Sequence, residues 1–384
     1  MFSIKKKLLY RNGIPFWRDS KSLSFLAQLL STLIIISVLG FLVTNLINAA
    51  NARGFSLGFG FINQEAGFPI SESVINYEPS NSFLKAFSVG ILNTLRVAIL
   101  GIILSTILGT FLGICRVSSN WLLKQISVTY VEIFRNIPLL VQLFFWYFIV
   151  FQALPRVQNA IELPGPIYLS NRGIFLPFIE FNDLSILWLI PLTMIPLLLI
   201  LKHKRLHHYL FFIFFIALAY GISFLQFGIP VSIDTPVLGK FNFAGGIRIT
   251  PEFGALLVGL TVYTSSFIAE IVRAGIQSVP RGQTESAYSL GLSKNETLRL
   301  IIIPQALKVI IPPLINQYLN LSKNSSLAIA IGFPDTFFVG RTMINQAGRA
   351  VPIFGMIMLA YGVMSLIWSL IGNFFDHKLN KGKV

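Results

Sequence analysis

Charged residues are scarce in this chain of 384 residues: they make up 12%, whereas soluble domains carry about 25%. Hydrophobic residues make up 54%, and the mean hydropathy is +0.73. This composition excludes an ordinary soluble domain and indicates a membrane protein. Cysteine is nearly absent, since Cys115 is the only one. An intrachain disulfide and a cysteine-based metal site are therefore excluded.

Several motifs of catalysis are also missing. The chain has no G-x-x-x-x-G-K-[ST] phosphate loop, no H-E-x-x-H and no G-x-S-x-G. We therefore expect no catalytic site, no ATP hydrolysis and no cofactor bound by this chain. Three of the four histidines lie in the basic loop 202–208, where no carboxylate accompanies them, so we expect a basic surface and no metal site. The net charge of +15 fits basic loops at a membrane surface. The sequence has no basic face interleaved with aromatic residues, so it does not indicate nucleic-acid binding.

Long apolar segments dominate the chain. A helix needs roughly 20 apolar residues to cross a bilayer. The sequence therefore predicts an all-α membrane protein with about eight transmembrane helices. The expected spans are 23–44, 86–114, 128–153, 184–201, 209–227, 253–272, 300–321 and 353–375. Segment 327–332 is too short to cross, which leaves a re-entrant segment or the end of a broken helix.

Lysine and arginine set the expected orientation. With both termini in the cytoplasm, the inner loops hold about twice as many basic residues as the outer loops, as the positive-inside rule requires. The outer loops are rich in Gly, Pro and Asn and are expected to form a small cap. The expected parts are a basic cytoplasmic N-terminus (1–22), a first helix (23–44), an external loop (45–85), a permease core (86–375) with an inserted loop and helix pair (154–250) and a cytoplasmic loop (278–300), and a cytoplasmic tail (376–384).

A polar segment lies in the cytoplasmic loop 278–300, between two apolar spans. Pro280 and Gly282 end the preceding span, and Gln283 or Thr284 is expected to cap a short helix. Ala287, Leu290 and Leu298 form its apolar side, and such a helix can dock in a groove of a soluble partner. Gly291 permits a sharp turn, and Pro304 falls in the first turn of the next span, where its missing N–H does no harm.

Small residues recur every four positions in the second span, at Gly101, Ser105, Gly109 and Gly113. This spacing lets another helix approach closely. The stripe packs either against a helix of the same chain or against another subunit.

Two spans carry charged residues that need an explanation. Glu132 and Arg135 share a helix face ahead of Pro138, and they form either an ion pair at the membrane edge or a pore-lining hinge. Glu270 follows Thr264 and Ser265 near the end of the sixth span. A carboxylate there is costly unless it is paired or wet, so Glu270 either pairs with Arg273 or another arginine, or lines or gates a path.

The seventh span has a polar stripe at Asn316, Asn320 and Asn324, followed by Ser325. A polar stripe on an apolar helix faces a cavity or another helix. It fits either a path for a polar solute or hydrogen bonds between helices.

The blocks 93–95, 132–142, 269–283 and 285–304 together resemble permease subunits of polar amino-acid ABC importers. In the last block E-x-A-x3-G-x9-I-x-I-P is similar to the family's coupling-loop pattern E-A-A-x3-G-x9-I-x-L-P, with Ser286 and Ile303 as mild departures. The extra first span, the long loop before residue 86 and the pair 184–227 look like the longer general L-amino-acid permeases.

The resemblance implies a type I importer with a five-helix core, a cytoplasmic coupling helix and a place in the bacterial inner membrane. It also implies four kinds of partner: a second permease chain, a dimer of ATP-binding subunits that uses the ATP, an external solute-binding protein and an amino-acid substrate. The residues that it assigns to ATPase coupling are Glu285, Ala287, Gly291, Leu292, Lys294 and Pro304; those expected on the path are Glu270, Thr264, Ser265, Asn316, Asn320, Asn324, Ser325 and Arg135.

Two rival functions make different demands on the sequence. A secondary transporter driven by an ion gradient would need carboxylates in mid-span and paired inverted repeats. Glu270 is the only carboxylate that lies so far into an expected span. A scaffold or receptor without transport would have no use for the asparagine stripe.

Overall fold

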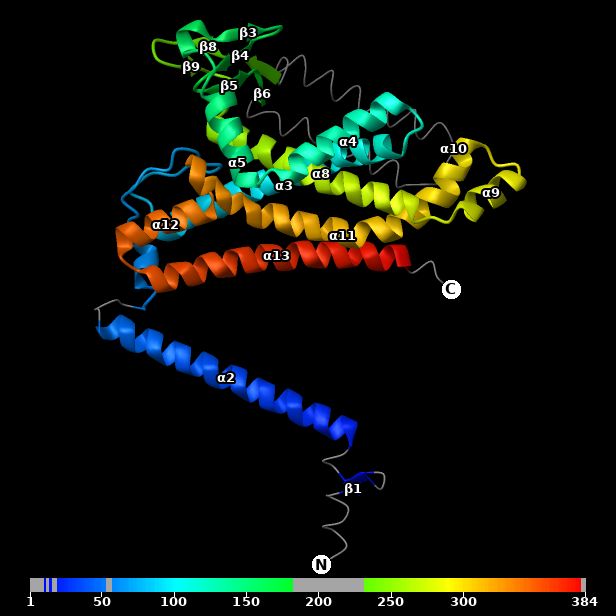
Figure 1. The fold of residues 1–384 in the computed structure, drawn as a ribbon. Helices are drawn as coiled ribbons and strands as arrows, with labels where there is room; N and C mark the ends of the chain where they lie inside the picture. The colour runs from blue at the N-terminus through cyan, green and yellow to red at the C-terminus, as the bar shows by residue number, and fades with distance from the viewer. Residues whose placement is uncertain (1–9, 12–13, 16–18, 53–56, 182–230, 381–384) are drawn as a thin grey trace, which may run out of the picture.

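The structure is a computed structural model, and it describes residues 10–11, 14–15, 19–52, 57–181 and 231–380 (Figure 1). Within these residues five helices are long and apolar enough to cross a membrane, or six if one bent pair counts as a span. The predominantly helical architecture predicted from the sequence is confirmed. The expected spans 184–201 and 209–227 lie outside the described residues.

Four of the long helices form a bundle, and each follows an apolar run of the sequence. They are α3 (Phe83–Val117), α8 (Pro251–Gln277), the continuous helical segment from Lys294 to Ile331, which contains α11 (Ile303–Asn324), and α13 (Ala350–Asn380). Local capping sets two of their starts: the Ser82 hydroxyl accepts a hydrogen bond from Lys85 N, and the Thr250 hydroxyl accepts one from Phe253 N. Segment 327–332, left open by the sequence, belongs to the 3₁₀ turn Ser325–Ile331 that ends the third of these helices.

The segment expected to be one span at 128–153 is bent, which makes it either a broken span or a re-entrant loop. Helix α4 (Trp121–Asn136) meets α5 (Leu139–Phe144) and the π-helix Phe145–Phe151 at an angle of 103°. Pro138 forces its neighbour Ile137 into an extended conformation. The buried Gln142 amide then donates to the carbonyls of Phe134 and Ile137, at 2.8 and 2.9 Å, which the break leaves without helical partners.

The small-residue stripe of α3 packs inside this chain. A Cβ added at Gly109 would lie 2.6 Å from the Ile268 Cβ, and one added at Gly113 would lie 2.6 Å from the Val272 Cβ. Both neighbours belong to α8. Of the two interpretations that the sequence left open, packing within the chain is the one observed. Helices α3 and α8 form the centre of the bundle, and α4, α11 and α12 (Thr336–Ala347) pack around them.

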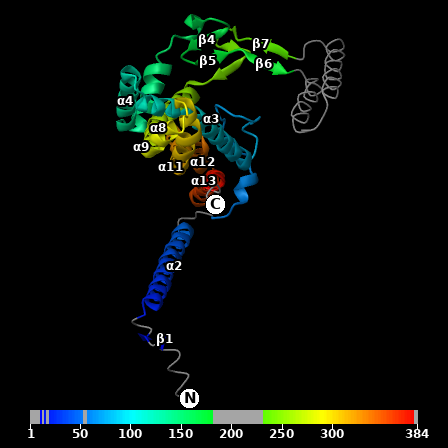
Figure 2. The same cartoon turned by 90° about the vertical axis from the view of Figure 1, so that its right-hand side faces the viewer.

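A small β-stranded cap stands on one side of the helices (Figure 2). Its main sheet is antiparallel in the order β10-β5-β4-β3. Val157, Phe175 and Phe243 form a core of their own beneath it. The sequence predicted an outer cap but not its strands, which are too short for a periodicity argument. They are β3 (Ile161–Leu163), β4 (Ile167–Ser170), β5 (Gly173–Leu176), β6 (Phe178–Phe181), β7 (Val231–Asp234), β8 (Val237–Leu238), β9 (Phe243–Ala244) and β10 (Ile247–Ile249).

Helix α2 (Ser20–Ala52) stands apart from the bundle in both views (Figures 1 and 2). None of its most apolar window is buried within this chain. It is apolar on all sides, which is the composition of a helix surrounded by lipid or by other subunits. The expected first span is confirmed as a helix long enough to cross a bilayer, and a short hairpin of β1 (Tyr10–Arg11) and β2 (Ile14–Pro15) precedes it.

Candidate functional site

A short exposed helix, α9 (Arg281–Ser289), joins α8 to the next long helix at one end of the bundle (Figure 1). Gly291 ends it with a φ of 80°. Gly291 N donates to the Tyr288 carbonyl at 2.9 Å, and Leu292 N donates to the Ala287 carbonyl at 3.1 Å. These two bonds form a Schellman motif, which satisfies the last carbonyls of the helix. The turn expected at Gly291 is thus present, and it needs a residue without a Cβ.

The side chains of α9 divide into an anchored side and a free side. Ala287 is buried against its own chain at 3% exposure, whereas Tyr288 is 49% and Leu290 82% exposed. The sequence placed Ala287 and Leu290 on one apolar side, and that grouping is wrong. Glu285 is exposed, and Leu292 is half-buried. The helix also begins earlier than predicted: Pro280 is its N-cap, and neither Gln283 nor Thr284 caps it.

A second turn of helix, α10 (Lys294–Thr297), follows at once and is capped by a box that the sequence analysis missed. Ser293 Oγ accepts from Glu296 N, and a Glu296 carboxylate oxygen accepts from Ser293 N at 2.9 Å. The signal was visible as S-x-x-E. The Ser293 hydroxyl also donates to this carboxylate at 2.7 Å. Lys294 starts this turn and is exposed.

Pro304 enters the long helix without breaking it. A π-helical turn, Leu298–Ile302, precedes it, and Pro304 lies at the start of α11. A π-turn shifts the hydrogen-bond register by one residue, which accommodates a proline that has no N–H. Pro304 lies in the first turn of α11, but the helical segment as a whole begins at Lys294, so Pro304 is not in the first turn of the span.

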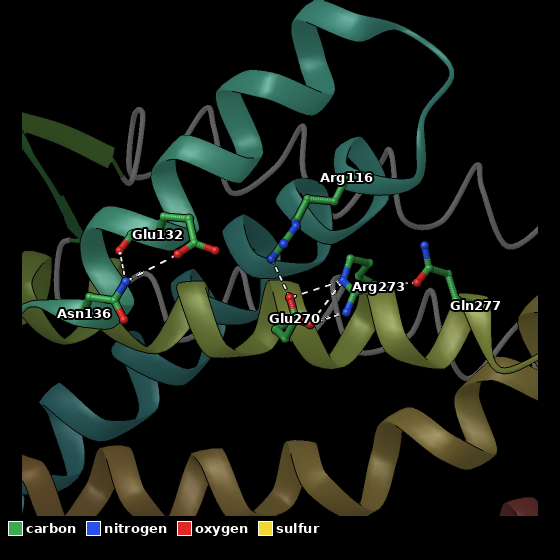
Figure 3. A network of polar contacts seen from close by, with 6 residues as sticks. All are labelled: Arg116, Glu132, Asn136, Glu270, Arg273 and Gln277. Atoms are coloured by element: carbon green, nitrogen blue, oxygen red, sulfur yellow. Dashed lines mark hydrogen bonds and ion pairs between the residues drawn. The ribbon is translucent and has the colours of Figure 1, made fainter.

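The end of α3 and the last turns of α8 meet at Glu270 near the same end of the bundle (Figure 3). Arg116, from the end of α3, lies 2.5 Å from a Glu270 carboxylate oxygen, and Arg273, one turn along α8, pairs with the other oxygen. The Glu270 side chain is one quarter exposed. The pairing with Arg273 was one interpretation of the sequence, but Arg116 was not foreseen. Two cations hold one carboxylate, so a net positive charge remains there.

Of the two interpretations that the sequence left open for Glu132 and Arg135, the ion pair is not formed within the described residues. Glu132 accepts from Asn136 Nδ2 at 3.4 Å (Figure 3). The Arg135 guanidinium lies 5.4 Å from the centre of the Phe267 ring, a cation–π distance. Arg135 is exposed and lies beside the break in the chain at Pro138.

The other expected path residues occupy different environments. Ser265 is buried and shares a hydrogen bond of 2.8 Å with Tyr130 Oη, and Thr264 is 3% exposed. Asn316 and Asn320 are exposed on the surface of α11, and Asn324 is half-buried. Ser325 is buried and donates to the Ser322 carbonyl at 2.8 Å. Their assignment to a path stays a prediction.

A polar clamp at the opposite ends of α3 and α8 was missed altogether. Glu72, in the loop before α3, lies 2.7 Å from the Arg96 guanidinium and accepts a hydrogen bond from the Thr250 hydroxyl. Arg96 also stacks 4.1 Å from the centre of the Phe253 ring. Asn93 Nδ2 donates to the Glu72 carbonyl at 2.8 Å and to the Pro334 carbonyl at 2.9 Å. These contacts connect the loop before α3, helices α3 and α8, and the segment that leads into α12.

A buried carboxylate, Asp335, organises the start of α12. Its side chain accepts from Phe338 N at 2.8 Å and from Tyr361 Oη at 2.8 Å. Beside it, Thr336 N donates to the Thr94 hydroxyl at 3.0 Å. Asp335 is fully buried. It lies in a helix that the sequence analysis did not predict, although D-T-F-F is an ordinary N-cap signal.

The described part of the chain is a bundle of apolar helices long enough to cross a membrane, with a short exposed helix between two of them. The family model of the binding-protein-dependent transport system inner membrane component matches residues 101–383, and the chain belongs to this family. The resemblance seen in the sequence is thereby confirmed, and the rival secondary transporter gains no support.

Named relatives cover almost the whole chain. A putative amino-acid ABC transporter permease of Escherichia coli, YhdX, is 42% identical over 93% of this chain and 94% of its own length. The general L-amino acid transport system permease AapQ of Rhizobium johnstonii is 42% identical over 94% of this chain and 93% of its own length. The crystal structure of an amino acid ABC transporter with histidines aligns at 24% identity and a TM-score of 0.48, over 77% of this chain and 95% of that one.

Proposed function

We propose that this chain is the membrane subunit of an ATP-driven importer of amino acids. It is inserted in a bacterial inner membrane with both termini in the cytoplasm. It forms the path together with a second, homologous permease chain. A dimer of ATP-binding subunits binds and hydrolyses the ATP, and an external solute-binding protein delivers the substrate. The names of the relatives support amino acids as the substrate class.

Helix α9 is the observation that carries this proposal. It exposes Tyr288 and Leu290, whereas Ala287 anchors it to the rest of the chain. Leu290 is 82% exposed outside the membrane spans, so its burial by a partner would remove apolar surface from water and stabilise the complex. Aromatic and large apolar residues that enter a pocket on a partner dominate interface energies.

Movement of α9 is passed on through short connections. The Schellman turn fixes α9 to Leu292, and α10 runs without interruption into α11. Gln305 Nε2 also donates to Gln283 Oε1 at 3.3 Å, which links the start of α11 to α9 directly. Closure of the ATPase dimer therefore pulls on the whole segment from Lys294 to Ile331. The exposed amides Asn316 and Asn320 lie on this segment and line the path for a zwitterionic solute.

The first test is to purify the tagged chain from its native membrane and identify what accompanies it by mass spectrometry. A phosphate-loop ATPase and a second permease in comparable amounts are expected. Leu290→Ser should weaken recovery of the ATPase by about tenfold, since a central apolar contact contributes about 1–2 kcal/mol. Val237→Ser is the matched control, because Val237 is 63% exposed on the cap, far from α9.

The second test is uptake of labelled amino acids into vesicles that contain the complex. ATP-dependent uptake that needs the solute-binding protein is expected. Purification of the chain alone in several detergents, or uptake driven by an ion gradient without ATP, would contradict the proposal.

A further inference from the structure

A pocket of about 280 Å³ opens on the β-stranded cap. The cap lies away from α9 and α10 (Figure 1). This volume lies just below the roughly 300 Å³ at which pockets for drug-sized ligands begin. It therefore suits a small group. The pocket is lined by Arg156, Val157, Gln158, Asn171, Arg172 and Phe241.

The backbone beneath the pocket is fixed by its own hydrogen bonds. Asn171 N donates to the Pro155 carbonyl at 2.8 Å, which joins the β4–β5 turn to the segment that carries Arg156. Arg172 N donates to Ser170 Oγ at 3.2 Å, and Arg248 Nε donates to the Arg172 carbonyl at 2.9 Å. The two arginine backbones are thus held in place before any ligand arrives. Such preorganisation lowers the entropy that binding costs.

The charge of the pocket is unbalanced. Arg156 and Arg172 are both exposed, and within the described part of the chain neither forms an ion pair. The amides of Gln158 and Asn171 add hydrogen-bond donors. Two guanidinium groups and two amides around a small hollow match the planar, two-oxygen geometry of a carboxylate. Lysines in the same places would lack this fork of donors.

We propose that this pocket of the external cap binds a carboxylate group, distinct from any site on the path between the spans. The proposal rests on the importer function proposed above. The carboxylate has two possible sources: a free amino acid captured outside the membrane, or an acidic side chain on the solute-binding protein. Phe241, 70% exposed at the rim, packs against the apolar part of either ligand.

The test compares the complete complex in lipid nanodiscs with its R156Q/R172Q variant. The matched control is K85Q/R341Q, which removes two positive charges outside the pocket. One arm titrates L-glutamate onto the complex without the solute-binding protein and measures binding calorimetrically. The other arm measures the solute-binding protein concentration that half-maximally stimulates ATP hydrolysis.

Loss of the guanidinium groups should weaken one of these arms by about tenfold or more, since hydrogen bonds to charged groups are the strong ones. Weaker glutamate binding identifies a free amino acid as the source. A raised half-saturating concentration of the solute-binding protein, suppressed by salt in the wild type, identifies an acidic side chain. Equal values for both variants and the wild type in both arms overturn the proposal. Wild-type complex that shows no stimulated ATP hydrolysis overturns the importer function itself, so the two failures are distinguishable.

Discussion

Replacing Gly109 by alanine tests the packing on which the bundle depends. The new Cβ would lie 2.6 Å from the Ile268 Cβ and 2.8 Å from the Ser265 carbonyl oxygen. Both distances are well below normal contact. A change of rotamer can move the Ile268 methyl group, but the Ile268 Cβ and the Ser265 carbonyl are fixed to the backbone of α8 and cannot move alone. Helices α3 and α8 must therefore separate by some tenths of an ångström along their shared length.

The size of the effect follows from two opposing contributions. Overpacking of this kind costs about 1–3 kcal/mol. Alanine in place of glycine within a helix also stabilises, by up to about 1 kcal/mol. Gly362→Ala shows the second contribution alone, because Gly362 lies inside α13 with nothing within 4 Å of its added Cβ. We expect Gly109→Ala to be less stable than Gly362→Ala by about 1–3 kcal/mol, since the helix contribution cancels.

The assay is thermal or denaturant unfolding of the purified proteins in the same detergent, followed by circular dichroism. Gly362→Ala should unfold at or above the wild-type midpoint, and Gly109→Ala clearly below it. Equal midpoints for the two variants would refute the intimate packing of α3 on α8. A reversed order would mean that the stripe faces a subunit or lipid instead.

Three further substitutions probe other parts of the molecule. Glu72→Gln removes the charge facing Arg96 and should lower stability by about 1–3 kcal/mol, with a double-mutant cycle against Arg96→Gln as the measurement. Gly291→Ala puts a Cβ in a left-handed conformation at a cost of about 1 kcal/mol. The number of ATP molecules hydrolysed per amino acid imported should therefore rise, while the variant is still inserted in the membrane. Asp335→Asn keeps an acceptor for Tyr361 Oη and a helix cap, so its unfolding midpoint should equal or exceed the wild type, whereas Asp335→Ala should lose about 1–2 kcal/mol.

Hydropathy predicts the long helices well because each needs only an apolar run of sufficient length. The segment 128–153 shows that an apolar run does not reveal a bend between two helices. Pro138 is visible in the sequence, but the 103° turn also requires Gln142 to satisfy the carbonyls of Phe134 and Ile137. Only a three-dimensional arrangement shows that an amide in an apolar segment serves this purpose. The strands of the cap were not predicted for a related reason: a strand of two to four residues is too short to show a usable periodicity.

The candidate site divides in the same way between local and distant partners. Arg273 lies one turn from Glu270, so helical spacing predicts their contact. Arg116 lies 154 positions away, and nothing in the sequence selects it. Glu72 with Arg96 and Thr250 is again a distant set, joined only once α3 and α8 lie side by side. Helix α9 could be predicted because its signals, a polar stretch with Gly291 and Pro304 at defined spacings, are all local.

The two polar clusters and the glycine stripe together restrict where this protein can move. Helices α3 and α8 are joined at one end through Glu72, at the other through Glu270, and along their middle by close contacts at Gly109 and Gly113. A pair fastened at three levels moves as one rigid unit. Conformational change during transport must therefore occur at the joints around this unit. Two joints with irregular backbone are the break at Pro138 and the π-turn Leu298–Ile302 ahead of α11. The second joint directly follows α10, so a displacement of α9 reaches it before it reaches the rest of α11.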